Sequence, residues 1–296
     1  MKVLVIGGTG FVGGHLIREL RRRGHTVVVF SHHRTRGPEQ GITIVRGDVT
    51  DPVSVGAAAW GCDAVINLVG IIREIPAKGI TFERLHTLAT RTVVTAAQEA
   101  GIRRIIQMSA LGTRPDAVST YHRTKYTAEE FVRGSSLDWT IFRPSLIFGP
   151  KDSFINMLAG QIRKFPIIPI IGDGSYRLQP IHADDVARCF VQALEMPETV
   201  GQIYALCGPD RFSYLQMLTI LGRILGLSKV TAIKLPVGLM KAIVPLLEKL
   251  PAFPLTSDQL QMLLEESICD CSWRVTFSFD TVRFEEGIRE YLKKRA

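Results

Sequence analysis

The sequence predicts an α/β protein with a doubly wound parallel sheet, followed by a smaller and mainly helical C-terminal lobe. Three observations lead to this fold class. A β-branched apolar run at the start is followed directly by a glycine-rich turn and an apolar-periodic helix. Short apolar strands and helices then alternate through the first half of the chain, and prolines become frequent after residue 150. A chain of 296 residues that is 46% hydrophobic can bury a sizeable core.

The first strand and the first helix are the best-defined elements. Residues 3–6 form the apolar run of a buried strand, and Gly7, Gly10 and Gly13 follow at intervals of three. The helix that begins at Phe11 should end near residues 21–24, where three arginines precede a glycine. Cations and a terminal glycine both suit the carboxyl end of a helix.

The remaining elements follow from the same alternation. We expect strands at residues 26–30, 42–45, 64–69, 104–108, 139–142 and 203–206, and helices through 57–59 and at 85–100, 121–133 and 184–194. Parallel strands with right-handed crossovers account for this spacing. We expect residues 1–150 to form the sheet domain and residues 180–206 to return to it. Residues 151–179 and 207–296 should then form the small substrate or partner lobe.

The glycine turn carries the first functional signal. Glycines leave backbone N–H groups accessible at a helix N-terminus, where the helix dipole favours a pyrophosphate. The candidate contacts for a dinucleotide are therefore Gly7, Thr9, Gly10, Phe11, Val12 and Gly13. A tight turn without a ligand is the alternative, but a position between a first strand and a helix favours the binding site.

The end of the second predicted strand bears on which dinucleotide binds. A carboxylate about 20 residues after the glycines usually binds the ribose 2′-hydroxyl of NAD(H). Residues 31–36 hold no acid but two histidines and two arginines, and a guanidinium group can bind a 2′-phosphate. We therefore expect NADP(H) in preference to NAD(H); an exposed basic loop is the alternative. Asp48 could accept the adenine amino group or cap the helix that begins near Pro52.

Tyr121 and Lys125 are the candidate catalytic residues. They are four residues apart and therefore share one face of a predicted helix. Near a nicotinamide, the lysine charge and the positive ring would lower the pKa of the tyrosine, which could then act as acid or base toward a hydroxyl or carbonyl. A surface pair is the alternative. Ser109, at the end of the fifth predicted strand, could polarise a carbonyl or could bond only to the backbone.

Charge, cysteines and hydropathy argue against several other classes of protein. The net charge of +8 is dispersed along the chain, which disfavours a nucleic-acid partner. The five cysteines have no metal-ligand spacing, so we expect no metal and reduced thiols. The first predicted strand starts at once, and no run reaches the ~18 apolar residues of a membrane span. We expect a cytoplasmic protein without a presequence or transmembrane segment, with at most peripheral membrane contact.

Residues 235–255 form an apolar stretch that is interrupted by charges and prolines. We expect a pair of helices packed on the core of the lobe. A docking surface for a partner protein or a membrane interface is the alternative.

Five motifs occur in a fixed order along the chain. They are Gly7-Gly8-Thr9-Gly10-Phe11-Val12-Gly13, Gly47-Asp48-Val49, Tyr121-x-x-x-Lys125, Arg143-Pro144-Ser145-Leu146-Ile147-Phe148-Gly149-Pro150 and Pro180-Ile181-His182-Ala183-Asp184-Asp185-Val186. On these motifs the chain resembles, over residues 1–206, the extended and atypical short-chain dehydrogenase/reductases, an epimerase/dehydratase-like group with a Rossmann domain. Residues 67–70, 108–112 and 250–259 are most similar to the nucleotide-binding accessory subunit of respiratory complex I and its bacterial relatives.

The resemblance implies roles for further residues. It places His33 and Arg34 at the adenosine ribose or its phosphate, Asp48 and Val49 beside adenine, and Leu68, Val69 and Gly70 at the nicotinamide ribose, with Lys125 on the ribose hydroxyls. It also places Pro144, Ser145 and Ile147 on the nicotinamide side and makes Tyr121 the acid or base.

Two functions agree with this resemblance. The first is an NADP(H)-dependent oxidoreductase or epimerase/dehydratase that acts on a hydroxyl or carbonyl of a small molecule, such as a sugar nucleotide or a quinone-type compound. The second is a non-catalytic nucleotide-binding structural or assembly factor of a respiratory or other membrane complex. Tyr121 and Lys125 favour the enzyme. The short segment between Ser109 and Tyr121, and His86 where such enzymes often have an asparagine, favour the second function.

Overall fold

The computed structural model describes residues 1–32, 41–248, 250, 253 and 255–293 of the chain. These residues form two compact units. The first unit holds residues 1–144, 183–206 and 273–278, and the second holds 145–182, 207–272 and 279–296.

A parallel sheet of seven strands forms the first unit within the described residues. The strands are β1 (Lys2–Ile6), β2 (Thr26–Ser31), β3 (Ile42–Arg46), β4 (Ala64–Asn67), β5 (Arg104–Met108), β6 (Asp138–Pro144) and β11 (Gln202–Leu206). Their order across the sheet is β11-β6-β5-β4-β1-β2-β3, so the chain winds outward from β1 in both directions. This arrangement confirms the predicted doubly wound fold.

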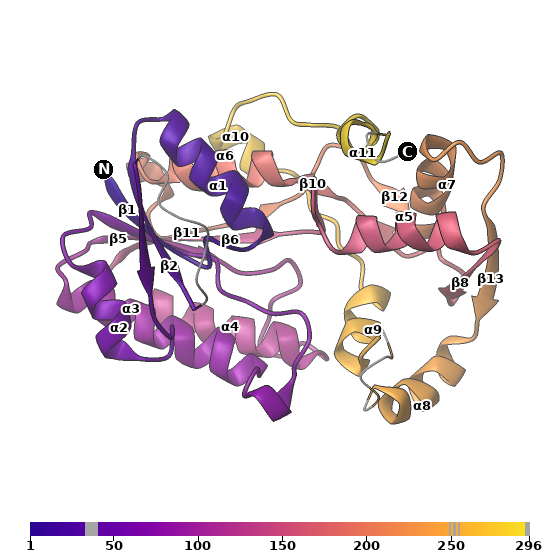
Figure 1. Ribbon diagram of the computed structural model, residues 1–296, viewed down its shortest axis with the longest axis horizontal. Coiled ribbons are helices and arrows are strands. Elements are labelled where there is room, and N and C mark those ends of the chain that lie inside the picture. The colour runs from indigo at the N-terminus through magenta and orange to yellow at the C-terminus, as the bar shows by residue number, and fades with distance from the viewer. Residues whose placement is uncertain (33–40, 249, 251–252, 254, 294–296) are drawn as a thin grey trace. The chain divides into compact units, whose positions relative to one another are not determined.

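Helices cover both faces of this sheet (Figure 1). On one face lie α1 (Phe11–Arg22), α6 (Ala183–Ala193) and α10 (Trp273–Thr276), and on the other lie α2 (Pro52–Ala59), α3 (Ala89–Glu99) and α4 (Thr120–Arg133). The strands are therefore buried on both sides, which is why they read as continuous apolar runs and not as alternating patterns. In β1, for example, the residues from Val3 to Ile6 are all buried.

The helix predicted at residues 85–100 differs from the observed element. A π-helical segment, η2 (Glu83–Leu88), precedes α3. A π-turn takes one more residue than an α-turn, and such segments are frequent at functional sites. Here it buries His86 on the side that faces α4.

The second unit contains helices and three short strand pairs among its described residues. The helices are α5 (Phe154–Lys164), α7 (Tyr214–Ile224), α8 (Val237–Leu247), α9 (Ser257–Leu264) and α11 (Phe284–Leu292). The strand pairs are β7 (Ile147–Phe148) with β10 (Ile181–His182), β9 (Arg177–Leu178) with β12 (Phe212–Ser213), and β8 (Ile167–Ile171) with β13 (Thr231–Leu235). The mainly helical lobe agrees with the prediction; β12 and β13 were not predicted, because they are too short or too irregular in pattern to stand out in the sequence.

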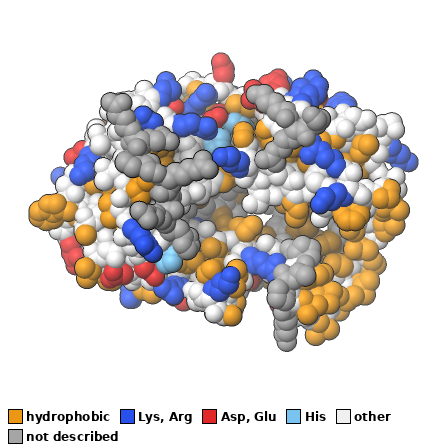
Figure 2. All heavy atoms as spheres, in the orientation of Figure 1, with side chains coloured by type: hydrophobic (Ala, Val, Ile, Leu, Met, Phe, Trp, Pro, Cys, Tyr) orange, Lys and Arg blue, Asp and Glu red, His pale blue; other side chains and the backbone are white. Residues whose placement is uncertain are grey.

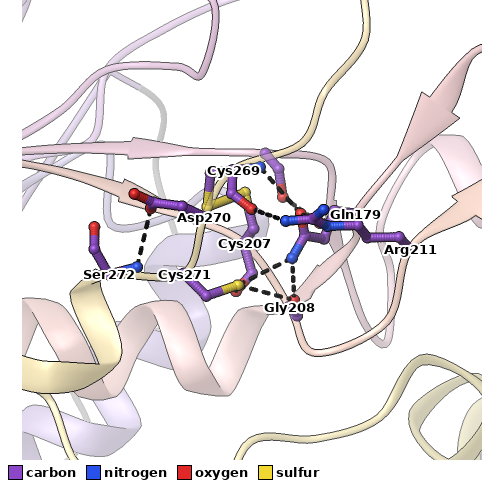
Figure 3. The surroundings of a disulfide bond; sticks show 9 residues. Gln179, Cys207, Gly208, Arg211, Cys269, Asp270, Cys271 and Ser272 are labelled. Carbon is purple, nitrogen blue, oxygen red and sulfur yellow. Dashed lines mark hydrogen bonds between the residues drawn. A yellow bond between two sulfur atoms is a disulfide. The ribbon is translucent and has the colours of Figure 1, made fainter.

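A disulfide between Cys207 and Cys269 lies in the second unit, so the prediction that all five cysteines are reduced is wrong (Figure 3). The two residues are 62 apart in sequence, and the fold brings their Cα atoms to 6.0 Å, a separation that suits such a bond. The third cysteine of this region, Cys271, accepts a hydrogen bond from Gln179 at 3.0 Å and lies 3.7 Å from the Gly208 carbonyl oxygen. The linear spacing of the cysteines gives no sign of this arrangement.

Candidate functional site

The glycine turn joins β1 to α1, and two of its glycines are required for different reasons. Gly7 has φ +81°, a conformation that L side chains rarely adopt, and a Cβ there would lie 3.2 Å from the Leu68 carbonyl carbon. A Cβ on Gly13 would collide with the Gly8 backbone, so α1 can approach the turn only with glycine at that position. The turn therefore holds the start of α1 against the ends of β1 and β4.

The N-terminus of α1 offers donors without acceptors from the protein's side chains. Gly10 is the N-cap; among the described residues no side chain caps the helix, and its first turn has no acid. Thr9 and Gly10 are exposed. The N–H groups of the first turn have no partner inside a helix, and the helix dipole makes this end positive. The residues present therefore fit the pyrophosphate of a dinucleotide.

Asp48 follows β3 and is fixed by hydrogen bonds. One carboxylate oxygen accepts from the Thr50 N–H at 2.9 Å and from the Thr50 hydroxyl at 2.8 Å, and the other accepts from Arg84 at 2.7 Å. Burial acts to raise the pKa of Asp48, but the bonds from Thr50 and the Arg84 charge outweigh it and leave the pKa below its usual value. No local motif indicates Arg84 as a partner of Asp48.

The alternative role of Asp48 as a helix cap is wrong. Asp51 is the N-cap of α2, and its side chain accepts from the N–H groups of Val53 and Ser54. At the end of β2, Ser31 lies opposite Arg46 of β3 in the strand register, and His32 is exposed. His33 and Arg34 lie outside the described residues, so their predicted contact with the ribose stays a prediction. Val49 is partly buried and packs against the core of the first unit.

The end of β4 is held by a buried amide network. Asn67 donates to Gln107 of β5 at 3.0 Å and accepts from the Val69 N–H at 3.2 Å. Leu68, Val69 and Gly70 continue from this fixed point. A Cβ on Gly70 would lie 2.7 Å from the Lys125 Nζ, so glycine at this position makes room for the lysine.

Tyr121 and Lys125 lie one turn apart on α4, and both are buried. Lys125 Nζ donates to the carbonyl oxygens of Val69 at 3.1 Å and Met108 at 3.3 Å, at the ends of neighbouring strands. Burial lowers the pKa of Lys125 to about 8, with a smaller opposing effect from the Glu129 charge. Burial raises the pKa of Tyr121 to about 12. The protein by itself thus holds the phenol neutral; the expected lowering of its pKa is not produced by Lys125.

His86 lies against the tyrosine. Its ring centre is 5.2 Å from that of Tyr121 in an edge-to-face contact. Phe82 stacks on His86 with ring centres 5.2 Å apart and also contacts Tyr121 edge-to-face at 5.8 Å. Burial, followed by the Lys125 charge, lowers the pKa of His86 to about 2, so the imidazole is neutral. The sequence singled out His86 as a substitution but not Phe82, although their i, i+4 spacing would have paired them.

Both ring nitrogens of His86 lie within hydrogen-bond distance of polar groups. Nδ1 is 2.9 Å from the Thr124 hydroxyl oxygen. Nε2 is 3.1 Å from the Ile71 backbone nitrogen and 3.1 Å from the Ile71 carbonyl oxygen. The imidazole links η2, α4 and the segment after β4, and so orients the tyrosine through packing.

The remaining predicted site residues belong to both units. Ser109 is buried, and its hydroxyl donates to the Thr113 hydroxyl at 3.3 Å, so the alternative that it bonds only to the backbone is wrong. Pro144 ends β6 in the first unit. Ser145 and Ile147 belong to the second unit, where the Ser145 hydroxyl donates to the Gln179 carbonyl at 2.6 Å.

Residues 3–207 match the NAD dependent epimerase/dehydratase family. The chain belongs to this family. Its glycine turn and its Tyr121–Lys125 pair both lie inside the matched range.

Several relatives are similar to this member of the epimerase/dehydratase family. An NADH dehydrogenase [ubiquinone] 1 alpha subcomplex subunit 9 of Arabidopsis thaliana, mitochondrial, is 31% identical over 86% of the chain, which spans 66% of that protein. A ceramide reductase of Caulobacter vibrioides is 30% identical over 66% of the chain, which spans 61% of that protein. The chain thus covers just under two thirds of these relatives' lengths. The solved structure of MoeE5 with UDP-glucuronic acid and NAD has a TM-score of 0.78 at 19% identity, covering all of both chains. It supports the fold.

Proposed function

We propose that the chain binds NADP(H) in preference to NAD(H) and reduces a carbonyl group of a small molecule, with Tyr121 as the proton donor. The observation that supports this most is the buried Tyr121–Lys125 pair, with a phenol whose pKa is about 12. A phenol with that pKa is protonated at neutral pH, so it can donate a proton but cannot accept one until it has lost its own. The direction of reaction that suits it is carbonyl reduction.

The residues for the cofactor are those at the carboxyl ends of the strands of the first unit. Gly7, Thr9, Gly10, Phe11, Val12 and Gly13 would hold the pyrophosphate, Asp48 and Val49 the adenine, and Leu68, Val69 and Gly70 the nicotinamide ribose. Lys125 has three N–H donors and uses two on the carbonyls of Val69 and Met108. Its third donor remains for a ribose hydroxyl.

A bound nicotinamide would supply the hydride to the carbonyl carbon. The Tyr121 hydroxyl donates its proton to the carbonyl oxygen as the C=O π electrons move onto that oxygen, and the resulting phenolate takes a proton back from water. His86 is neutral, and its two ring nitrogens are engaged by Thr124 and Ile71, so it positions the phenol and does not compete as an acid. Its contact with Tyr121 limits the orientations of the ring.

The preference for NADP(H) is supported by charge at the ends of β2 and β3. No carboxylate follows β2 at residues 31–36, and Arg46 lies opposite Ser31 in the sheet register. We expect Arg34→Ala and Arg46→Ala to weaken NADPH by about tenfold each while NADH changes little, because a charge-assisted bond to the 2′-phosphate is lost. Fluorescence titration measures both constants. Equal losses for the two cofactors would contradict the proposed role.

The second candidate function is a nucleotide-binding structural or assembly subunit of a respiratory or other membrane complex, in which the cofactor stabilises the fold and is not turned over. Two observations favour it. The plant relative is named as a subunit of NADH dehydrogenase, and the Ser109 hydroxyl is engaged by Thr113.

Single-turnover kinetics separates the two functions. The protein is loaded with NADPH, and its fluorescence is followed after addition of ketones, aldehydes, quinones and sugar nucleotides. Decay with one class, lost in Tyr121→Phe, supports the reductase and names its substrate class. Tightly bound NADPH that none of these compounds oxidises would overturn the reductase in favour of the structural subunit.

A further inference from the structure

Helix α8 of the second unit is apolar, yet it is scarcely buried. Between Val237 and Leu247 its one charged residue is Lys241, and Val244 is the one residue of the helix that is buried. The side chains of Leu239 and Leu246 are 50% and 69% exposed. Val244 packs with Ile171 and Leu260 in a small cluster. One side of α8 therefore packs against the chain as expected, whereas the other side is exposed.

Two other elements of the same unit expose apolar side chains. In the parallel pair β8–β13, Thr231 lies opposite Ile167 and Ile233 opposite Pro169. Residues two apart on a strand share a face, and Ile167 and Ile233 are 43% and 50% exposed. Phe165, directly after α5, is 58% exposed. We call Phe165, Ile167, Ile233, Leu239 and Leu246 the apolar face.

Hydrophobic side chains gather over the part of the second unit that contains α8 and β13 (Figure 2). Scattered exposed leucines are normal on protein surfaces, but a concentration of them marks an interaction site. The apolar face is therefore a candidate binding surface.

The charged residues within the segments that form the apolar face are all cations. The segments that form it carry the exposed cations Arg163, Lys164, Lys229, Lys234 and Lys241. No Asp or Glu occurs at residues 153–172 or 211–247. Carboxylates stand at all four ends of these ranges: Asp152, Asp173, Asp210 and Glu248. Glu248 accepts from the Ser257 N–H at 2.6 Å.

We propose that the apolar face is a docking surface for an anionic phospholipid bilayer. Apolar side chains interspersed with lysines are the pattern of interfacial segments, which bury their apolar residues at the acyl boundary and place cations among lipid phosphates. A second copy of the chain suits this face poorly, because a symmetric contact would set the same cations against each other. Among the described residues no helix could cross a bilayer, so the contact is with its surface.

Vesicle flotation with the full chain tests this. We expect binding to phosphatidylcholine vesicles that contain phosphatidylglycerol and weaker binding to phosphatidylcholine alone. Each cation near an anionic surface contributes about fivefold in affinity, so Lys164→Glu, directly before Phe165, with Lys241→Glu should reduce binding by more than about 20-fold. Lys78→Glu, at an exposed cation of the first unit, is the matched control and should bind normally.

A second set of variants tests the contribution of the apolar side chains to vesicle binding. Leu239→Gln with Leu246→Gln should abolish binding to both kinds of vesicle. Val275→Gln is the control, since Val275 of the first unit is 89% exposed and lies outside the apolar face. Circular dichroism confirms that each variant is folded.

Three outcomes would overturn the lipid surface. They are no binding to either vesicle, binding that the leucine variants leave unchanged, and a concentration-dependent dimer that Leu246→Gln abolishes. Tyr121→Phe should bind vesicles as the wild type does, so failure of the proposed reductase activity and failure of lipid docking are distinguishable.

Discussion

Lys125 in the first unit and Leu246 in the second depart from ordinary burial in opposite ways. The lysine is 3% exposed and the leucine's side chain 69%, whereas lysines are normally on the surface and leucines inside. The lysine has partners within its own unit, the carbonyls of Val69 and Met108. The leucine has no comparable cover among the described residues. Residues that depart from ordinary burial tend to mark functional positions. A buried charge with hydrogen-bond partners inside its own unit indicates a binding or catalytic site. An exposed apolar side chain without such cover indicates a surface that binds another molecule.

The largest effect on activity is expected from removing the proton donor next to the buried Lys125. Tyr121→Phe should lower single-turnover carbonyl reduction by about 10³-fold, because general acid catalysis contributes about that much, and should leave NADPH affinity unchanged. Tyr126→Phe on the same helix is the matched control, since Tyr126 contacts Arg133 and is only partly buried. Equal rates in the two variants would remove Tyr121 from the chemistry.

The next effect concerns stability against pH. Lys125 has a pKa of about 8 in the folded chain against an ordinary 10.5, so the unfolded chain binds more protons between these values. The free energy of unfolding should therefore rise with pH through this window, by about 3 kcal/mol. Below pH 8 the destabilisation from burying the charged Lys125 is fully present.

Lys125→Met should remove this dependence. Urea denaturation of both proteins at neutral and alkaline pH measures it, with the exposed Lys241→Met as control. Parallel pH curves for wild type and Lys125→Met would show that burial of the ammonium carries no such cost.

A smaller effect comes from the space that Lys125 occupies. Gly70→Ala brings a Cβ within 2.7 Å of Nζ, and displacing the ammonium should cost about 1 to 2 kcal/mol of stability together with NADPH affinity. Gly56→Ala in α2 meets nothing within 4 Å and should stabilise by about 0.5 to 1 kcal/mol. A Gly70→Ala protein with wild-type stability and affinity would show that the lysine can shift freely.

The smallest effect on stability is expected at the exposed Leu246. Leu246→Gln should change the free energy of unfolding by less than about 0.5 kcal/mol, as surface substitutions generally do, while vesicle binding falls. Chemical denaturation measures the first quantity. A loss of about 2 kcal/mol or more, typical of a buried leucine, would mean that α8 packs against the chain itself.

The first unit was predictable because its signals are local. The apolar runs of β1 and β5, the glycines before α1 and the Tyr121–Lys125 spacing each depend on residues close in sequence, and the parallel sheet follows from their order. The predicted Tyr121–Lys125 face exists, and both side chains point inward.

What the sequence could not supply are contacts between distant segments. The pairing of Arg84 with Asp48, the disulfide from Cys207 to Cys269 and the room that Gly70 gives Lys125 all depend on how strands and helices pack. The pKa of Tyr121 moved upward, against expectation, because burial is a property of the folded chain. The exposure of α8 is likewise invisible in a sequence whose apolar pattern fits packing equally well.

The division of the chain into interleaved segments has a consequence for synthesis on the ribosome. Strand β6 ends at Pro144, but its neighbour β11 begins only at Gln202, and residues 273–278 join the first unit later still. Until β11 emerges, the newly made sheet presents an open backbone edge, the feature most prone to mispairing with other chains. The time needed to translate residues 145–201 thus sets how long the edge of β6 stays unpaired.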